Sequence, residues 1–170
     1  MITSKTNPKI KNVVKLQKSS ERRAQNRIII EGRREIERAV SCGFIVDTLF
    51  VCKEIVKDTV DIKANVIEDV SLDVFENIAY REGSDGLLAV AIPKYSDLKD
   101  FKPKNNPLII VLETVEKPGN LGAIMRTADA AGVDAVIIAD PRTDLFNPNA
   151  IRASIGTIFS VPLFSCSSEE

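Results

Sequence analysis

An apolar strand, a helix and a second apolar strand follow one another in the second half of the chain, and this order restricts the fold more than any other feature. Leu108–Leu112 and Ala135–Ala139 are short apolar runs typical of buried strands. Between them, Pro118 suits the first turn of a helix and Gly132 suits its end. Two strands joined through a helix pair in parallel with a right-handed crossover. The sequence therefore predicts an α/β unit, extended by a helix at 147–154 and a third strand at 160–164.

The residues before Pro93 show the same alternation of helical and strand patterns. Apolar residues recur with helical spacing in three segments: 9–19, 32–42 and a segment that begins at Ser71, a suitable N-cap. Short apolar runs typical of strands occupy four segments: 28–30, 48–52, 62–67 and 86–92. This order predicts a small, separate α/β domain.

The composition changes between Lys94 and Pro107, where Lys, Asp, Asn and Pro predominate. Pro103 and Pro107 oppose regular structure, and such a composition is typical of a linker. We therefore predict one domain at residues 1–95, a linker at 96–107 and a second domain at 108–170.

Charge is distributed unevenly along the chain. Met1–Arg38 contains eleven Lys and Arg against four Asp and Glu, a net of +7, whereas Ala39–Glu170 has a net of −8. A basic segment rich in arginine favours contact with nucleic acid over the alternative, a basic helix facing solvent. We expect RNA contacts from six residues: Lys9, Lys11, Arg22, Arg23, Arg27 and Arg34.

The residue types exclude several kinds of chemistry. The chain has no histidine, which removes Ser–His–Asp and Cys–His catalysis and histidine-ligated metals. Its three cysteines lack metal-ligand spacing and are typical of reduced cytosolic thiols. The longest apolar run, Leu87–Ile92, is far below the ~18 residues of a membrane span, and the polar, basic N-terminus is unlike a secretory signal. We therefore expect a cytoplasmic protein without a metal.

Residues 113–132 follow the first strand of the second domain, at the edge where open α/β sheets bind ligands. They match neither of the common glycine-rich phosphate loops. Gly119 and Gly122 permit close approach by a ligand or another backbone. Arg126 lies about 200° around the helix from Ile124, and it therefore points away from the core. The predicted apolar face comprises Leu121, Ile124, Ala128 and Ala131. An ordinary helix with one solvent-facing arginine is the alternative interpretation.

The sequence Pro118-Gly-Asn-Leu-Gly122, followed by Arg126 and the run to Gly132, resembles the first signature motif of the SpoU/TrmH family of SPOUT-class RNA methyltransferases. Three further segments resemble that family in the same order: 27–32, 85–90 and 147–156. The resemblance implies an N-terminal α/β/α RNA-binding domain, similar to ribosomal and kink-turn-binding proteins. The first part of an α/β-knot methyltransferase domain would follow it.

The resemblance also implies a reaction. S-adenosylmethionine would donate a methyl group to a ribose 2′-oxygen of rRNA or tRNA, and the enzyme would be a homodimer. Asn120 and Arg126 match the family's catalytic positions. A guanidinium keeps its proton and is a poor base, so Arg126 suits binding of the target phosphate and stabilisation of the developing alkoxide better than base catalysis. Asn120 would orient Arg126 or the ribose, and Glu113 would either pair with a nearby cation or stay an inert charge.

Two motifs of the family, Gly-x-Glu-x-x-Gly and Ser-Leu-Asn, are not found in this sequence. Ser167 and Glu170 have the spacing of a capping box, which begins a helix. We therefore expect an incomplete chain, with cofactor-binding residues beyond Glu170, an uncovered sheet edge and little affinity for S-adenosylmethionine. Two other functions stay open: a non-catalytic module for structured RNA, and a small-molecule enzyme that uses Arg126 on an anionic substrate. The basic N-terminal segment argues against the small-molecule enzyme.

Overall fold

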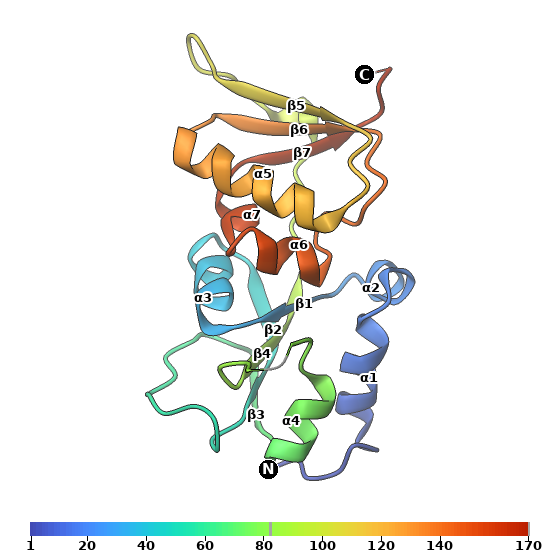
Figure 1. Cartoon of the computed structure of the whole chain (residues 1–170), viewed down its shortest axis with the longest axis vertical. Helices are drawn as coiled ribbons and strands as arrows, with labels where there is room; N and C mark the ends of the chain where they lie inside the picture. Colours follow the sequence, from blue (N-terminus) through green and yellow to red (C-terminus); the bar gives the residue numbers. More distant parts are fainter. Residues whose placement is uncertain (82, 170) are drawn as a thin grey trace. The chain divides into compact units, whose positions relative to one another are not determined.

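The computed structural model describes residues 1–81 and 83–169 and divides the chain into two compact units, 1–93 and 94–170 (Figure 1). The first unit contains α1 (Pro8–Leu16), α2 (Ser19–Gln25), β1 (Ile28–Glu31), α3 (Arg33–Ser41), β2 (Ile45–Val51), β3 (Val66–Asp69), α4 (Leu72–Ile78) and β4 (Leu87–Ile92). The second contains η1 (Leu98–Asp100), β5 (Ile109–Glu113), α5 (Pro118–Ala131), β6 (Ala135–Ala139), α6 (Pro148–Ala153), α7 (Thr157–Ser160) and β7 (Leu163–Cys166).

The sheet of the first unit has helices on both faces, which makes this unit an α/β/α sandwich. Its strand order is β1-β4-β2-β3, with β4 antiparallel to β1 and β2, and β3 parallel to β2. Side chains of α1 and α4 pack with Ile29 and Phe50 in one core cluster, and α3 packs against β1, β2 and β4. Ile28, Ile29 and Ile30 are all buried, since a strand covered on both faces places every side chain in the core.

Several elements of the first unit differ from the predicted ones. The first helix ends at Leu16 instead of Ser19, and it is followed by α2, which was not predicted from the sequence. Only Arg22 is buried on α2, so this short helix lacks the apolar stripe that reveals a helix in sequence. The strand predicted at 62–67 lies at 66–69 instead, although Ile62 is buried in the preceding loop. The strand was predicted too early because Ile62 is apolar, and its burial in a loop cannot be distinguished in sequence from burial in a strand.

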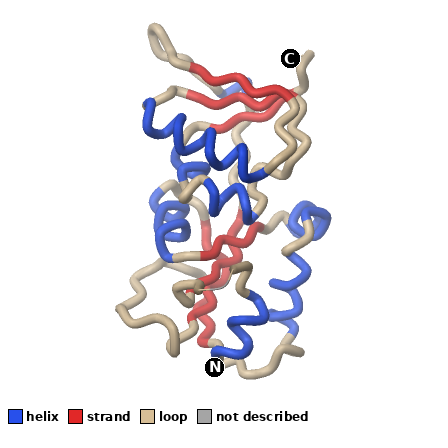
Figure 2. Tube along the Cα trace, viewed as in Figure 1, coloured by secondary structure: helices blue, strands red, loops and turns tan. Residues whose placement is uncertain are grey.

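The second unit has a parallel three-stranded sheet, as the strand–helix–strand order predicted. The strand order is β5-β6-β7, and both pairings are parallel. Helices α5, α6 and α7 contact one another and lie on one side of the strands (Figure 2). Strand β5 forms an edge, where Val111 is 65% exposed and Leu108, just before the strand, is 52% exposed. The expected uncovered edge is thus present, and β5 is less buried than its composition predicted.

The segment 94–107 packs on the second unit. Leu98–Asp100 forms a 3₁₀ turn, which contradicts the expectation of a segment without regular structure. Ser96 bridges to Phe164 of β7, and the rings of Phe101 and Phe164 have centroids 5.2 Å apart. The apolar residues of the segment lie before Pro103, so the two prolines do not prevent this part of the segment from packing on β7. In the part of the chain that the structure describes, no helix is long and apolar enough to cross a membrane.

Candidate active site and nucleic-acid interface

The carboxyl ends of the three parallel strands of the second unit meet at one edge. In the sheet register Glu113 pairs with Ala139, and Ala139 pairs with Cys166. Thr114 and Asp140, directly after β5 and β6, continue the ladder by donating their backbone N–H groups to the next strand, and both have positive φ angles, 50° and 46°. The chain therefore turns at equivalent positions after β5 and β6. The loops that follow these strands, which could hold a ligand, begin at the same edge of the sheet.

Helix α5 begins at this edge and presents Asn120 and Arg126 to solvent. Four of its residues are buried: Leu121, Gly122, Met125 and Ala128. The prediction that Arg126 points away from the core is confirmed. The predicted apolar face is wrong at its margins, because Ala131 is exposed and Ile124 only half-buried while Met125 occupies the core. The buried face of α5 is the face that contacts α6 and α7, and it differs from the face predicted from the apolar residues.

Gly122 lies against helix α6. A Cβ atom built at Gly122 would lie 2.5 Å from the Cβ of Ala153 and 2.8 Å from the backbone oxygen of Ala150. The expected close approach of another backbone is therefore confirmed at Gly122. At Gly119 nothing lies within 4 Å of such an atom, so this glycine provides no close contact. Helix α6, and not a ligand, therefore occupies the space at Gly122.

Helical geometry separates the two predicted catalytic residues. Six residues of α5 correspond to about 9 Å along its axis and about 120° around it, so Asn120 and Arg126 lie on different faces. Neither side chain has a hydrogen bond or ion pair with any residue that the structure describes. Both groups are therefore available to a ligand, but a direct orienting contact from Asn120 to Arg126 is absent within 1–81 and 83–169.

The segment 147–157 supports the site through internal hydrogen bonds. The Asn147 Oδ1 accepts from the backbone N–H of Asn149 at 2.9 Å and caps α6. Ser154 is fully buried, and its Oγ donates to the Ile151 carbonyl at 2.7 Å. The Thr157 Oγ1 donates to the Ser154 carbonyl at 2.8 Å. These polar residues fix the turn between α6 and α7, which holds α6 against Gly122.

Arg22 differs from the expectation that it contacts RNA. Its side chain is 3% exposed, and its Nη1 donates to the carbonyls of Leu16 and Gln17 at 2.9 and 2.8 Å. These are carbonyls at the end of α1, which have no partners inside that helix. A buried guanidinium in this position closes the turn between α1 and α2 and is not presented to RNA. Sequence alone did not distinguish it from Arg23.

The other five predicted RNA-binding residues are at least partly accessible. Lys9 pairs with Glu68, Arg27 with Asp47 at 3.1 Å, and Arg34 with Glu35 at 2.7 Å. Lys11 and Arg23 are exposed and have no partner among the described residues. Three exposed lysines of the same basic segment were not predicted to contact RNA: Lys5, Lys15 and Lys18. Lys15 lies one turn after Lys11 on α1, a spacing that was visible in the sequence.

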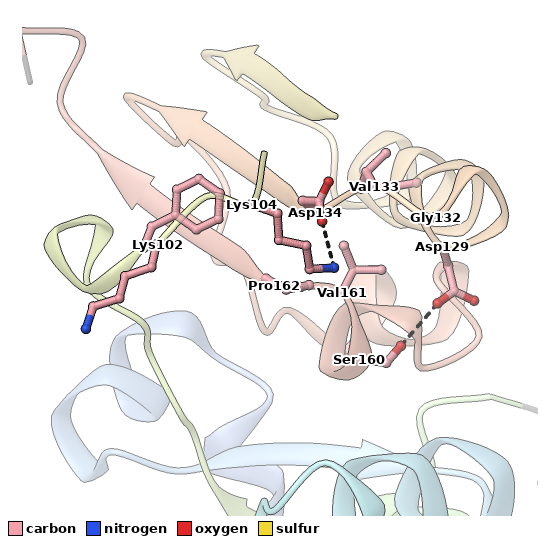
Figure 3. Close-up of a pocket in the computed structure, with 11 residues that line it drawn as sticks. Lys102, Lys104, Asp129, Gly132, Val133, Asp134, Ser160, Val161 and Pro162 are labelled. Atoms are coloured by element: carbon pink, nitrogen blue, oxygen red, sulfur yellow. Dashed lines mark hydrogen bonds and ion pairs between the residues drawn. The ribbon is translucent and has the colours of Figure 1, made fainter. Parts of the chain in front are cut away.

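A cavity of about 450 Å³ lies at the opposite end of the parallel sheet (Figure 3). Asp134, just before β6, accepts from the backbone N–H of Leu108 and pairs with Lys104, each at 3.0 Å. The Leu108 hydrogen bond, supported by Lys104, lowers the pKa of Asp134. Ser160 donates to Asp129 across the rim at 3.4 Å. The Lys104–Asp134 ion pair joins the segment 94–107 to the start of β6, away from the loops that follow the strands.

A nucleoside cofactor needs an enclosed, largely apolar cleft. Three cavities in the described part of the chain, of about 450, 700 and 660 Å³, are lined by residues other than Glu113, Thr114, Asp140 and Arg126. Asp140, at the edge after β6, instead accepts from the backbone N–H of Ser168. None of these three cavities therefore encloses a nucleoside beside Glu113, Thr114 and Asp140.

Two family sequence models match this chain. The MRM3-like substrate binding domain matches residues 7–89, and the SpoU rRNA Methylase family matches residues 107–170. The 23S rRNA (guanosine(2553)-2'-O)-methyltransferase RlmP of Bacillus subtilis is 31% identical over 163 residues, which are 95% of this chain and 63% of that protein. The chain thus spans less than two thirds of the length of this relative.

Solved structures agree with these matches. An RNA 2'-O ribose methyltransferase is 35% identical with a TM-score of 0.83, over 99% of this chain and 66% of that one. The AdoMet-bound rRNA methyltransferase of Sinorhizobium meliloti is 30% identical with a TM-score of 0.86, over 99% and 65%. A substrate-binding unit followed by a parallel α/β methyltransferase unit defines a SPOUT-class RNA methyltransferase fold. The chain belongs to the SpoU/TrmH family of that class, and the predicted family and fold class are confirmed.

Proposed function

We propose that the protein methylates a ribose 2′-oxygen of rRNA or tRNA and that this chain provides the RNA-binding unit and the catalytic arginine. The observation that carries the proposal is the position of Arg126. It is exposed on the helix that begins at the carboxyl edge of the parallel sheet, and no described residue neutralises its charge. A free guanidinium on this helix is suited to a phosphate of the substrate.

Arg126 has an electrostatic role in this proposal. S-adenosylmethionine supplies the methyl group, and the ribose hydroxyl must lose its proton during attack. Because the guanidinium stays protonated, Arg126 binds the target phosphate and stabilises charge that develops on the 2′-oxygen. Asn120, on a different face of α5, contacts the ribose and does not orient Arg126.

The two units have separate roles in the proposal. Residues 1–95 bind RNA, 96–107 connect the units, and 108–170 begin the methyltransferase domain. Five exposed or half-exposed basic residues contact RNA: Lys9, Lys11, Arg23, Arg27 and Arg34. Arg22 is left out because it is buried. The complete enzyme acts as a homodimer in the cytoplasm and needs no metal.

A second candidate function is a non-catalytic module that binds structured RNA. It is favoured for this chain alone, because Arg126 lines none of the three cavities of about 450, 700 and 660 Å³. The two functions differ in whether a methyl group is transferred.

Transfer of tritium from labelled S-adenosylmethionine to rRNA and tRNA distinguishes them when the complete product of the gene is assayed. We expect labelled ribose 2′-O-methyl nucleosides, loss of transfer in Arg126→Ala, and unchanged transfer in Lys99→Ala, which removes an exposed charge elsewhere in the second unit. RNA binding should persist in Arg126→Ala. Full activity of Arg126→Ala would disprove the assignment of this arginine.

A further inference from the structure

Helix α1 and the turn into α2 carry basic side chains that no carboxylate of the described chain neutralises. Four residues form this α1–α2 cluster: Lys11, Lys15, Lys18 and Arg23. All four are exposed, and none of their side chains has a hydrogen bond or ion pair with a residue that the structure describes. The charge of the cluster is therefore available to an anionic partner.

Helical geometry places the cluster on one surface of the first unit. Lys11 and Lys15 lie one turn apart, about 6 Å along the axis of α1, on the face opposite its buried residues. Lys18 follows as the residue before α2, and Arg23 is exposed on α2, which contacts α1 (Figure 1). The buried residues of α1 are Ile10, Val13 and Leu16.

The end of α1 does not oppose a phosphate at this surface. The last carbonyl groups of a helix carry partial negative charge, which repels anions. The Arg22 Nη1 donates to two of them, those of Leu16 and Gln17. Between residues 8 and 27 the sequence has one carboxylate, Glu21, which accepts from Gln25 at 3.1 Å. The buried arginine thus leaves RNA contact to the cluster and covers the negative end of the helix beside it.

Three other basic residues proposed to contact RNA differ from the cluster. Lys9, Arg27 and Arg34 each form an ion pair with a carboxylate of the same unit. A phosphate must compete with that carboxylate for the cation, so the net gain from such a contact is smaller than from an unpaired cation. The cluster should therefore provide the larger share of the electrostatic affinity.

The cluster lacks side chains suited to reading bases. Recognition of unstacked RNA bases commonly uses aromatic rings, and residues 8–27 contain none. The 40% exposed side chain of Val14 offers only a small apolar surface. Lysine acts as a flexible point charge toward phosphates, a contact that positions RNA and carries no sequence information.

We propose that the α1–α2 cluster binds the phosphate backbone of the substrate RNA without reading its base sequence; the inference rests on the proposed function. The cluster supplies affinity, and the choice of nucleotide depends on other parts of the protein. Because such binding releases counterions from the RNA, its strength falls as the salt concentration rises.

The dependence of RNA affinity on salt tests the proposal in the 170-residue chain. The test variant combines Lys11→Ala, Lys15→Ala and Lys18→Ala. It should reduce the slope of log K against log salt by about 2, because each lost phosphate contact contributes about 0.7–0.9. Fluorescence anisotropy with a labelled RNA hairpin of mixed sequence measures the slope.

Two further variants with the same change in charge serve as comparisons. The first combines Lys9→Ala, Arg27→Ala and Arg34→Ala and should reduce the slope by less than the test variant, because these cations are paired. The second removes three exposed lysines elsewhere in the same unit and should keep the slope. It combines Lys53→Ala, Lys57→Ala and Lys63→Ala.

A second hairpin, with an equal stem length and an unrelated sequence, tests whether bases are read. The test variant should lose the same fold of affinity for both hairpins. Urea unfolding of each variant checks that it is folded. If the alanine variant is unstable, the combination of Lys11→Gln, Lys15→Gln and Lys18→Gln removes the same charges with longer side chains and should give the same slope.

An unchanged slope in the test variant would overturn the proposal, and so would an equal reduction in either comparison variant. A loss of affinity for one hairpin alone would show base reading and would also overturn it. In the complete protein the test variant should raise KM for RNA and keep kcat, because Arg126 is unchanged. Absence of methyl transfer by the unmodified complete protein would disprove the proposed function while the slopes still decide this proposal, so the two failures are distinguishable.

Discussion

Gly122 of α5 and Ala153 of α6 lie so close that a methyl group at Gly122 would reach within 2.5 Å of the Ala153 Cβ. The backbone nitrogen of Ser154 lies 2.7 Å from the same position. The two helices therefore meet backbone to backbone, one turn before Arg126. Glycine is required here for packing and not for an unusual φ angle, and the contact links the first signature motif to the segment 147–157.

Gly122→Ala should destabilise the chain by about 1–3 kcal/mol, because the added methyl group meets backbone atoms that cannot rotate away. Urea unfolding followed by circular dichroism measures the change. Gly119→Ala is the matched control on the same helix, and with open space around it the substitution should be neutral or stabilising. Equal effects of the two substitutions would contradict the close contact.

Arg22→Ala should destabilise the chain by about 1–3 kcal/mol, since two buried carbonyls lose their donor. Arg23→Ala should change the free energy of unfolding by less than about 0.5 kcal/mol, because the Arg23 side chain is exposed. Both values come from denaturant titration. A larger loss in Arg23→Ala than in Arg22→Ala would show that the buried arginine is assigned to the wrong position.

The double substitution Lys11→Ala with Arg23→Ala should weaken RNA binding and flatten its dependence on salt. Each phosphate contact that is lost should reduce the slope of log K against log salt by about 0.7–0.9. Fluorescence anisotropy with a labelled rRNA fragment at several salt concentrations measures this slope. Lys53→Ala, which removes a lysine paired with Asp69 at 2.5 Å, is the control and should keep the slope. An unchanged slope in the double variant would exclude this surface from RNA binding.

Asp134 should make stability depend on pH in the acid range. Its pKa is lowered in the folded chain, so its stabilising contribution is complete above the unfolded value of about 3.9 and is lost as the pH falls through the folded pKa. The free energy of unfolding should therefore decrease below about pH 4. Asp134→Asn should show a smaller decrease over the same interval, measured by urea titration at each pH. A parallel decrease in both proteins would rule out a contribution from Asp134.

The chain alone should bind S-adenosylmethionine weakly or not at all, because the cavities described do not enclose the edge beside Glu113 and Thr114. Isothermal titration calorimetry of the 170-residue chain checks this directly. Micromolar affinity would mean that these residues form a cofactor site by themselves.

The sequence by itself determined the local features of the structure, namely those that depend on residues close together in the chain. Pro118 and Gly132 mark the ends of α5 in the structure within one residue of the predicted bounds, because proline at N1 and a left-handed glycine act locally. The alternation of apolar runs was enough to predict a parallel second sheet. The exposure of Arg126 also followed from helical spacing alone, and the motif around it indicated the family.

Only the tertiary structure decided how these residues are used. Burial of Arg22 depends on where the carbonyls at the end of α1 lie, and no spacing in the sequence encodes that. The sequence allowed either a ligand or another backbone to approach Gly122, and only the structure shows that α6 fills the space, since packing between elements depends on contacts distant in sequence. The cavity of about 700 Å³ was not predicted at all, because it arises where α4 and the following segment meet the core of the first unit.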